Sequence, residues 1–194
     1  HPYIISDPYM LAVTNLIRAI KHLAFEIDPI GSFQWNNQLY LLGYSEGGYA
    51  TMAAQKGIEE SLLDELPITA SFPMAGPYDL AGTMVDYFLS IPNYPQPYYV
   101  PNVLFTHLDY YGSLDDIDQY FLPVWSDTLP ILFDGTHSGW EINDLMPENP
   151  LDILLPGVLE EFIEDEEHFF RLTLLENTLL DWVPITPTYL IHGM

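Results

Sequence analysis

The sequence predicts an α/β fold in which helices pack on a parallel β-sheet. Two observations lead to this prediction. Helical and strand-like patterns alternate along residues 7–74, and the pattern Gly43-x-Ser45-x-Gly47 stands between a short apolar run and a helix-forming stretch. Alternation of this kind is typical of parallel sheets, because parallel strands need a crossover connection that is usually a helix.

The first expected element is a helix that starts near Asp7-Pro8, with the proline in its first turn. Residues 29–32 end it. Apolar residues recur between these points at helical spacing and predict one buried face: Val13, Leu16, Ile17, Ile20, Leu23, Ala24 and Ile27. Buried strands are expected over residues 39–42 and 68–74. Small residues in the helix between them allow close packing on the sheet: Ala50, Ala53 and Ala54.

Ser45 lies at the expected junction of strand and helix. A serine on such a sharp turn takes a strained backbone conformation, so Gly43 and Gly47 are expected to be required for their lack of a Cβ. The turn would lift the Ser45 hydroxyl out of the sheet, and the Glu46 backbone N–H would face a developing oxyanion. Ser45 is therefore the candidate nucleophile and Glu46 the candidate oxyanion donor. The alternative is a chance Gly-Ser-Gly turn.

Residues 79–184 differ from the rest of the chain in composition, because they contain most of the prolines and many of the aromatic residues. Short helices are predicted there over residues 80–89, 100–110, 117–122 and 158–177. The acidic run from Glu160 to Glu167 is interpreted as the solvated face of a helix. A last strand is predicted over residues 188–191. This pattern predicts a core formed by residues 1–78 and 185–194, with 79–184 as a helical insertion.

The composition limits the classes of function. A chain of 194 residues with 48% hydrophobic residues can build one domain with a real core. A net charge of −24 disfavours binding to nucleic acid and to anionic membrane surfaces. It is consistent with a saline habitat or simply with an acidic soluble protein. Apolar runs are too short for a membrane-spanning helix, so no stable membrane insertion is expected. The absence of cysteine excludes disulfides and thiolate metal sites.

Several segments together resemble the secretory lipase and esterase branch of the α/β-hydrolases. They are His1-Pro2-Tyr3, Gly43-Tyr44-Ser45-Glu46-Gly47-Gly48, Gly76-Pro77-Tyr78-Asp79-Leu80 and Pro187-Thr188-Tyr189-Leu190-Ile191-His192-Gly193. The resemblance implies that the insertion is a lid, that no cofactor is used, and that a secreted or periplasmic location is favoured. It also implies that the acid and the histidine of the catalytic triad follow beyond Met194, so that the chain alone lacks competence.

Two residues within the chain are candidates to replace the implied acid and base. His192 ends the last expected strand near the edge that carries Ser45, although a structural histidine is the alternative interpretation. Asp79 follows the strand over residues 68–74 and could act as the acid, or it could cap the helix that starts at Leu80. No two histidines stand three or four residues apart, so the sequence indicates no metal site.

These observations favour a serine-type carboxylic-ester hydrolase acting on a small ester or lipid. Tyr44, Tyr87, Phe88 and Trp140 are the candidate substrate-binding residues, and the last three are expected to face Ser45. Two alternatives stay open. One is an oligopeptidase or acyl-peptide hydrolase, which uses the same turn, and the other is a non-catalytic pseudo-hydrolase that binds a ligand. The sequence leaves the oligomeric state open.

Overall fold

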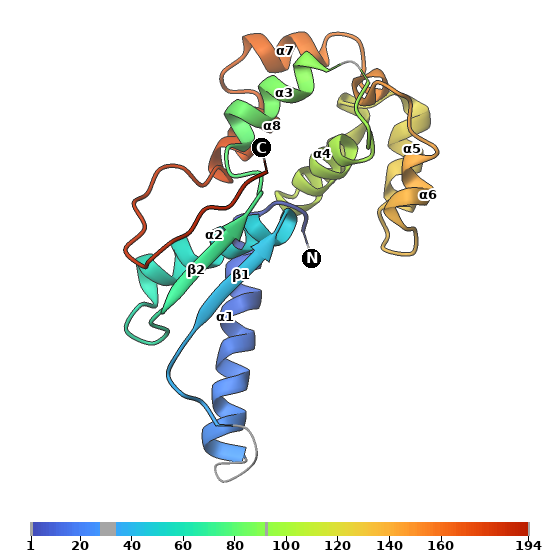
Figure 1. The fold of residues 1–194 in the computed structure, drawn as a ribbon. Helices are drawn as coiled ribbons and strands as arrows, with labels where there is room; N and C mark the ends of the chain where they lie inside the picture. Colours follow the sequence, from blue (N-terminus) through green and yellow to red (C-terminus); the bar gives the residue numbers. More distant parts are fainter. Residues whose placement is uncertain (1, 28–33, 92, 194) are drawn as a thin grey trace. The chain divides into compact units, whose positions relative to one another are not determined.

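A computed structural model describes residues 2–27, 34–91 and 93–193 of the chain. Contacts between Cα atoms divide the chain into two compact units (Figure 1). The sheet unit comprises Ile4–Asp79 and Asn177–Met194, and the helical unit comprises His1–Tyr3 and Leu80–Glu176. Each unit has a hydrophobic core of its own.

The sheet unit is built on two parallel strands, β1 (Tyr40–Tyr44) and β2 (Ala70–Met74). The register pairs Tyr40 with Ala70 and Tyr44 with Met74, so both strands end at the same edge of the sheet. The crossover between them is helix α2 (Glu46–Ser61). The structure thus confirms the two predicted strands as parallel neighbours, with bounds shifted by one or two residues.

The predicted strand over residues 188–191 is only partly formed. Isolated parallel bridges join Ser71 to Thr188 and Met74 to Ile191, so the segment does run beside β2. Pro73 lies between these two bridges and has no N–H to donate across the gap. The segment therefore pairs with β2 at its two ends without forming a continuous third strand.

Helices α1 (Ser6–His22) and α2 cover one face of the strands, as Figure 1 shows. Between them and the strands lies the core of the sheet unit, which contains Ile17, Leu39, Leu41, Ala54, Ile58, Leu66 and Ile68. The predicted apolar face of α1 is buried at Ile17, but Leu16 is 61% exposed. That part of the prediction is wrong, because α1 packs chiefly on α2 and buries a narrower arc. A π-helical turn, Leu23–Ile27, continues α1, and the predicted helix end at residues 29–32 lies outside the described residues.

The opposite face of β1 is exposed. Side chains alternate between the two faces of a strand, and those of Tyr40, Leu42 and Tyr44 are 53%, 69% and 72% exposed. The expectation that this strand is buried on both faces is therefore wrong for the described sheet unit. The physical reason is that both of its long helices lie on one side of the strands (Figure 1).

The helical unit contains six α-helices in its described part. They are α3 (Val85–Ser90), α4 (Tyr99–Tyr110), α5 (Pro123–Leu132), α6 (Gly139–Asn143), α7 (Val158–Glu164) and α8 (Phe169–Glu176). A π-helical turn at Leu80–Met84 precedes α3, and single 3-10 segments lie at Leu114–Gln119 and Pro150–Ile153. The core is rich in aromatic residues and contains Phe105, Leu108, Phe121, Leu129, Ile153 and Phe170. The predicted helices over 80–89 and 100–110 are confirmed with small shifts, whereas the one over 117–122 is replaced by the 3-10 segment Leu114–Gln119.

The predicted long helix over residues 158–177 is two helices, α7 and α8. Two side chains break it by accepting backbone hydrogen bonds. Asp165 Oδ1 accepts from the Glu167 N–H at 2.9 Å, and His168 Nδ1 accepts from the Phe170 N–H at 3.2 Å. Such local bonds compete with the helical ladder. The acidic side chains between residues 160 and 167 are exposed, as predicted.

None of the helices in the described ranges is long and apolar enough to cross a lipid bilayer.

Candidate active site

Ser45 stands between β1 and α2, at the edge where both strands end. Its backbone angles are φ 56° and ψ −121°, and its side chain is exposed. Positive φ is uncommon for a residue other than glycine and costs about 1–3 kcal/mol, so it persists only where the surroundings impose it. The prediction of a strained serine on a strand-to-helix turn of a parallel sheet is thus confirmed. The chemical role of Ser45 is a separate question.

Close packing around the turn explains why glycines are needed, but not at both predicted positions. A Cβ added to Gly43 would lie 2.0 Å from the carbonyl oxygen of Gly47, and one added to Gly48 would lie 2.3 Å from that of Met74. A Cβ added to Gly47 would meet no described atom within 4 Å. The prediction that Gly47 must lack a Cβ is therefore wrong, and Gly48 has that requirement instead. The first turn of α2 lies against the end of β2 and leaves no room for a side chain at Gly48.

Backbone hydrogen bonds hold Ser45 on both sides. The Ser45 N–H donates to the Met74 carbonyl at 2.9 Å, which ties the turn to the end of β2. The Ser45 carbonyl accepts from the N–H groups of Gly48 and Tyr49 at 2.9 and 3.2 Å, which starts α2. The N–H of Glu46 belongs to the first turn of this helix, where backbone N–H groups and the helix dipole favour negative charge.

A tyrosine of α1 reaches the first residue of α2. The Tyr9 hydroxyl donates to Glu46 Oε1 at 2.5 Å and accepts from the Ile4 N–H at 3.3 Å. The Tyr9 ring also meets the Tyr49 ring edge to face, with 5.8 Å between centroids. Sequence reasoning missed these contacts. Tyr9 and Glu46 are 37 residues apart, and neither lies in a pattern that predicts a pair.

A second set of contacts secures the segment that ends in His192. Glu59, on α2, accepts hydrogen bonds from the N–H groups of Ile185 and Thr186 at 2.8 and 3.0 Å. Gln55 Nε2 donates to Glu59 at 2.9 Å and to Thr188 at 2.7 Å. Burial raises the pKa of Glu59, but the hydrogen bonds from Ile185, Gln55 and Thr186 outweigh it and hold that pKa below its ordinary value.

The candidate base and acid do not bond to Ser45. His192 is exposed and its Nδ1 lies 3.0 Å from the Gly193 carbonyl oxygen, close to the bridge between Ile191 and Met74. Asp79 is partly buried directly before the turn at Leu80–Met84. In the part of the chain that the structure describes, no histidine or carboxylate is hydrogen-bonded to the Ser45 hydroxyl.

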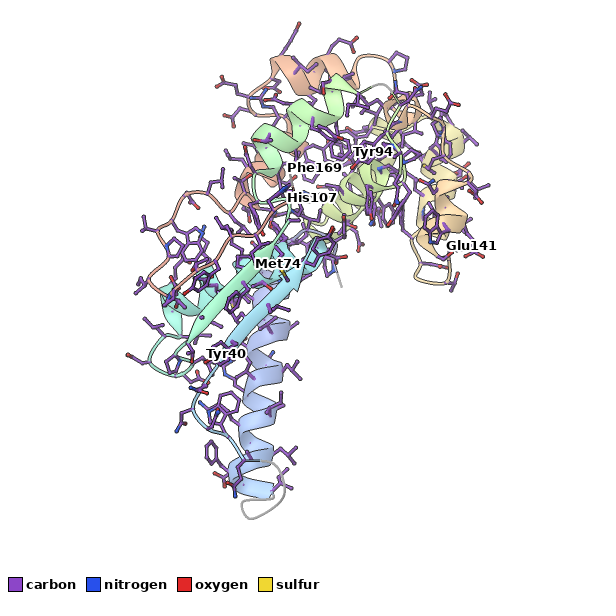
Figure 2. The ribbon with its side chains drawn as sticks, in the orientation of Figure 1. Tyr40, Met74, Tyr94, His107, Glu141 and Phe169 are labelled. Carbon is purple, nitrogen blue, oxygen red and sulfur yellow. The ribbon has the colours of Figure 1, made fainter. Side chains whose placement is uncertain are left out.

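Three other histidines are engaged within the helical unit. His107 is fully buried, with its Nδ1 2.8 Å from the Thr173 hydroxyl, and Figure 2 labels it near α4. His168 accepts the backbone hydrogen bond that starts α8. His137 lies 3.6 Å from Asp134 on the surface.

The candidate substrate-binding residues divide between the two units. Tyr44 is the exposed last residue of β1, directly before Ser45. Tyr87 and Phe88 lie on α3 and form an aromatic cluster with Tyr94, whose ring centroid is 4.6 Å from that of Phe88. Tyr94 is labelled in Figure 2. Trp140, on α6, is 72% exposed. Their roles toward a substrate stay a prediction.

No cluster of three or more histidine or acidic side chains suited to a metal ion occurs among residues 2–27, 34–91 and 93–193.

Comparisons with known proteins give matches among solved structures alone. No family model matches the chain, and no curated protein does. The rice cell wall degrading esterase LipA from Xanthomonas oryzae matches 100% of this chain with 27% identity and a TM-score of 0.86, over 51% of its own chain. A protein assigned as a hydrolase from Legionella pneumophila matches 99% with 25% identity and a TM-score of 0.85, over 50% of its own chain.

A third match is more distant and bears on the fold alone. Candida antarctica lipase A matches 98% of this chain with 19% identity and a TM-score of 0.66, over 42% of its own chain. The chain thus spans about half the length of these solved structures or less. The fold of this chain is thus similar to the folds of α/β-hydrolase-type proteins, which include an esterase and a lipase.

Proposed function

We propose that this chain carries the nucleophile of a serine-type carboxylic-ester hydrolase. The observation that carries the proposal is the backbone of Ser45, which holds a positive φ between a parallel strand and a helix. A serine in that conformation presents its hydroxyl at the end of the sheet, where a nucleophile is accessible to a substrate carbonyl. The structural similarity to esterases supports the same reaction class.

In the proposed reaction, Ser45 Oγ attacks the ester carbonyl and the Glu46 N–H binds the oxyanion that forms. This donor stands in the first turn of α2, so its direction is fixed before the substrate arrives. The attack forms a bond from Oγ to the carbonyl carbon, and collapse of the intermediate expels the alcohol and leaves an acyl-serine that water hydrolyses. The hydroxyl proton passes to an imidazole base, which then donates it to the departing alcohol. In this fold the nucleophile, the acid and the histidine follow one another along the chain in the order Ser, Asp, His.

We propose that this base and its acid come from chain beyond the 194 residues, since no described histidine is hydrogen-bonded to the Ser45 hydroxyl. His192 remains the internal candidate and Asp79 its candidate acid. We assign residues 79–184 the part of a lid, with Tyr87, Phe88 and Trp140 available to bind an apolar ester or lipid. Tyr44 would contact the substrate from the end of β1.

The test measures hydrolysis of p-nitrophenyl acetate and butyrate by two proteins, the 194-residue chain and a chain extended to the length of the solved esterases. General-base catalysis contributes about 10²–10⁴-fold, so the extended chain should be faster by about this factor. Ser45→Ala should abolish its activity, whereas Ser61→Ala, at the exposed end of α2, should not. A fluorophosphonate should label Ser45, as peptide mass spectrometry would show.

Each alternative has its own outcome. Rapid Ser45-dependent turnover by the 194-residue chain would show that an internal base such as His192 suffices. Cleavage of aminoacyl or acyl-peptide substrates in preference to simple esters would favour an oligopeptidase. An extended chain that hydrolyses neither class and resists the fluorophosphonate would favour a non-catalytic binding protein.

A further inference from the structure

We infer that Tyr9 is a positioning residue for the oxyanion donor, acting through the carboxylate of Glu46. This inference rests on the proposed function, because it concerns the residue whose backbone N–H would bind the oxyanion. It goes beyond the motif, since the Gly-x-Ser-x-Gly pattern demands nothing of the side chain after the serine.

Tyr9 is a buried residue of α1 that reaches the start of α2. It is 5% exposed, and its hydroxyl donates to Glu46 Oε1 at 2.5 Å. A hydrogen bond from a hydroxyl to a carboxylate is stronger than one between neutral groups. The bond therefore fixes the side chain of the first residue of α2 against a helix that belongs to the same compact unit.

The Tyr9 hydroxyl is itself held by a second hydrogen bond. It accepts from the Ile4 N–H at 3.3 Å, and Ile4 is a buried β-branched residue with φ 57°. A positive φ is an outlier for such a residue and needs surrounding contacts to hold it. Nearby, the Ser6 N–H donates to Asn177 Oδ1 at 2.9 Å, and the Tyr49 hydroxyl donates to the Asn177 carbonyl at 2.7 Å. The start of α1 is thus fastened beside the first turn of α2.

Two peptide groups flank Ser45, and a different element holds each of them. On one side, the Ser45 N–H donates to the Met74 carbonyl of β2. On the other side, the Ser45–Glu46 peptide carries the N–H proposed for the oxyanion, and the Tyr9 contact anchors the residue that supplies it. The strand therefore fixes one side of the serine, and α1 fixes the other.

The position of the Glu46 charge matters as well. The carboxylate of Glu46 belongs to the residue beside the nucleophile, where negative charge develops during the reaction. A carboxylate free to turn toward that charge would oppose it, because like charges at short range disfavour one another. The hydrogen bond from Tyr9 holds the carboxylate toward α1. Tyr9 thus fixes the direction of the Glu46 N–H and holds the Glu46 carboxylate away from the oxyanion.

The experiment is a double-mutant cycle that follows hydrolysis of p-nitrophenyl acetate. It uses the 194-residue chain if that chain shows Ser45-dependent hydrolysis, and otherwise the extended chain. Its variants are Tyr9→Phe, Glu46→Gln and their combination, with Tyr40→Phe as a matched control on the exposed face of β1. Active sites are counted by fluorophosphonate labelling of Ser45, so that kcat refers to folded enzyme. Removing an oxyanion donor outright costs about 10²–10³ in kcat, and misaligning one should cost about tenfold.

We expect Tyr9→Phe to lower kcat per labelled site about tenfold, as misalignment of the oxyanion donor would, with KM essentially unchanged. Adding Glu46→Gln to Tyr9→Phe should leave kcat per site still well below the wild-type value, because the amide removes the opposing charge but the donor stays without its Tyr9 anchor. A Tyr9→Phe enzyme that loses thermal stability but keeps its kcat per site would overturn the inference, and so would a double variant that regains the wild-type kcat. If Ser45→Ala leaves activity intact, the proposed function itself fails. No outcome of the double-mutant cycle gives that result, so a failure of the function and a failure of the inference can be told apart.

Discussion

Gly43→Ala should destabilise the sheet unit strongly. The added Cβ would lie 2.0 Å from the Gly47 carbonyl oxygen and 2.6 Å from Thr51 Oγ1. An ordinary contact is about 3.5 Å, so β1 and α2 would have to separate by about 1.5 Å at a backbone atom that no rotamer change can move. Overpacking of this kind costs about 3 kcal/mol. For a chain of this length, that loss lowers Tm by about 6–12 °C.

Gly47→Ala is the matched control in the same motif. Its Cβ would meet no described atom within 4 Å, and its backbone φ is not positive. Alanine in place of glycine favours a helix by up to about 1 kcal/mol, so Tm should stay constant or rise slightly.

The assay for this pair combines thermal unfolding by circular dichroism with hydrogen exchange of peptides from β1 and α2. The second readout is needed because the two units could unfold separately. If Gly43→Ala unfolds at the wild-type temperature, or if Gly47→Ala is the more damaging change, the steric reasoning is refuted.

Two further predictions concern pH. Glu59 has its pKa held below the ordinary value of 4.5, so its carboxylate stabilises the sheet unit above that pH, and the contribution is lost as pH falls through the lowered pKa. Glu59→Gln should cost about 1–3 kcal/mol at pH 7 by leaving backbone N–H groups with a poorer acceptor, and denaturant titrations between pH 3 and 7 should show a weaker dependence on pH. The pKa of His168 lies below its ordinary 6.5, chiefly because burial lowers it. The charges of Asp165 and Glu161 raise that pKa and the charge of Arg171 lowers it, but burial outweighs them. The helical unit should therefore lose stability as pH falls below about 6.5, and His168→Asn should remove that slope in hydrogen exchange of α8.

Much of the sheet unit could be predicted from the sequence because its signals are local. Apolar runs mark β1 and β2, and the small residues of α2 indicate a helix that lies close on a sheet. The third segment could not be predicted in detail, because its failure to form a strand depends on Pro73 in the neighbouring β2. The exposure of Leu16 and Leu42 could not be predicted either, because periodicity identifies an apolar face but does not show which element covers it.

The helical unit was harder to predict where side chains interrupt a regular pattern. Residues 158–177 have helical periodicity throughout, yet Asp165 and His168 accept backbone hydrogen bonds and divide them into α7 and α8. At the candidate site, the motif located Ser45 and its backbone conformation. It did not reveal Tyr9, because the contact between Tyr9 and Glu46 depends on how α1 and α2 pack.

The strain at Ser45 explains why the motif alone cannot define the site. A positive φ at a serine costs about 1–3 kcal/mol, and an isolated Gly-Ser-Gly turn would relax to a cheaper conformation. Here the Ser45 N–H donates to the Met74 carbonyl, and Gly48 approaches that same carbonyl so closely that no side chain fits. One such hydrogen bond contributes about 0.5–1.5 kcal/mol, so the remainder comes from the packing of β1, β2 and α2. The conformation of the candidate nucleophile is thus a property of the assembled sheet. A substitution that weakens the packing of β2 should therefore change the backbone conformation of Ser45 even when the motif itself is unchanged.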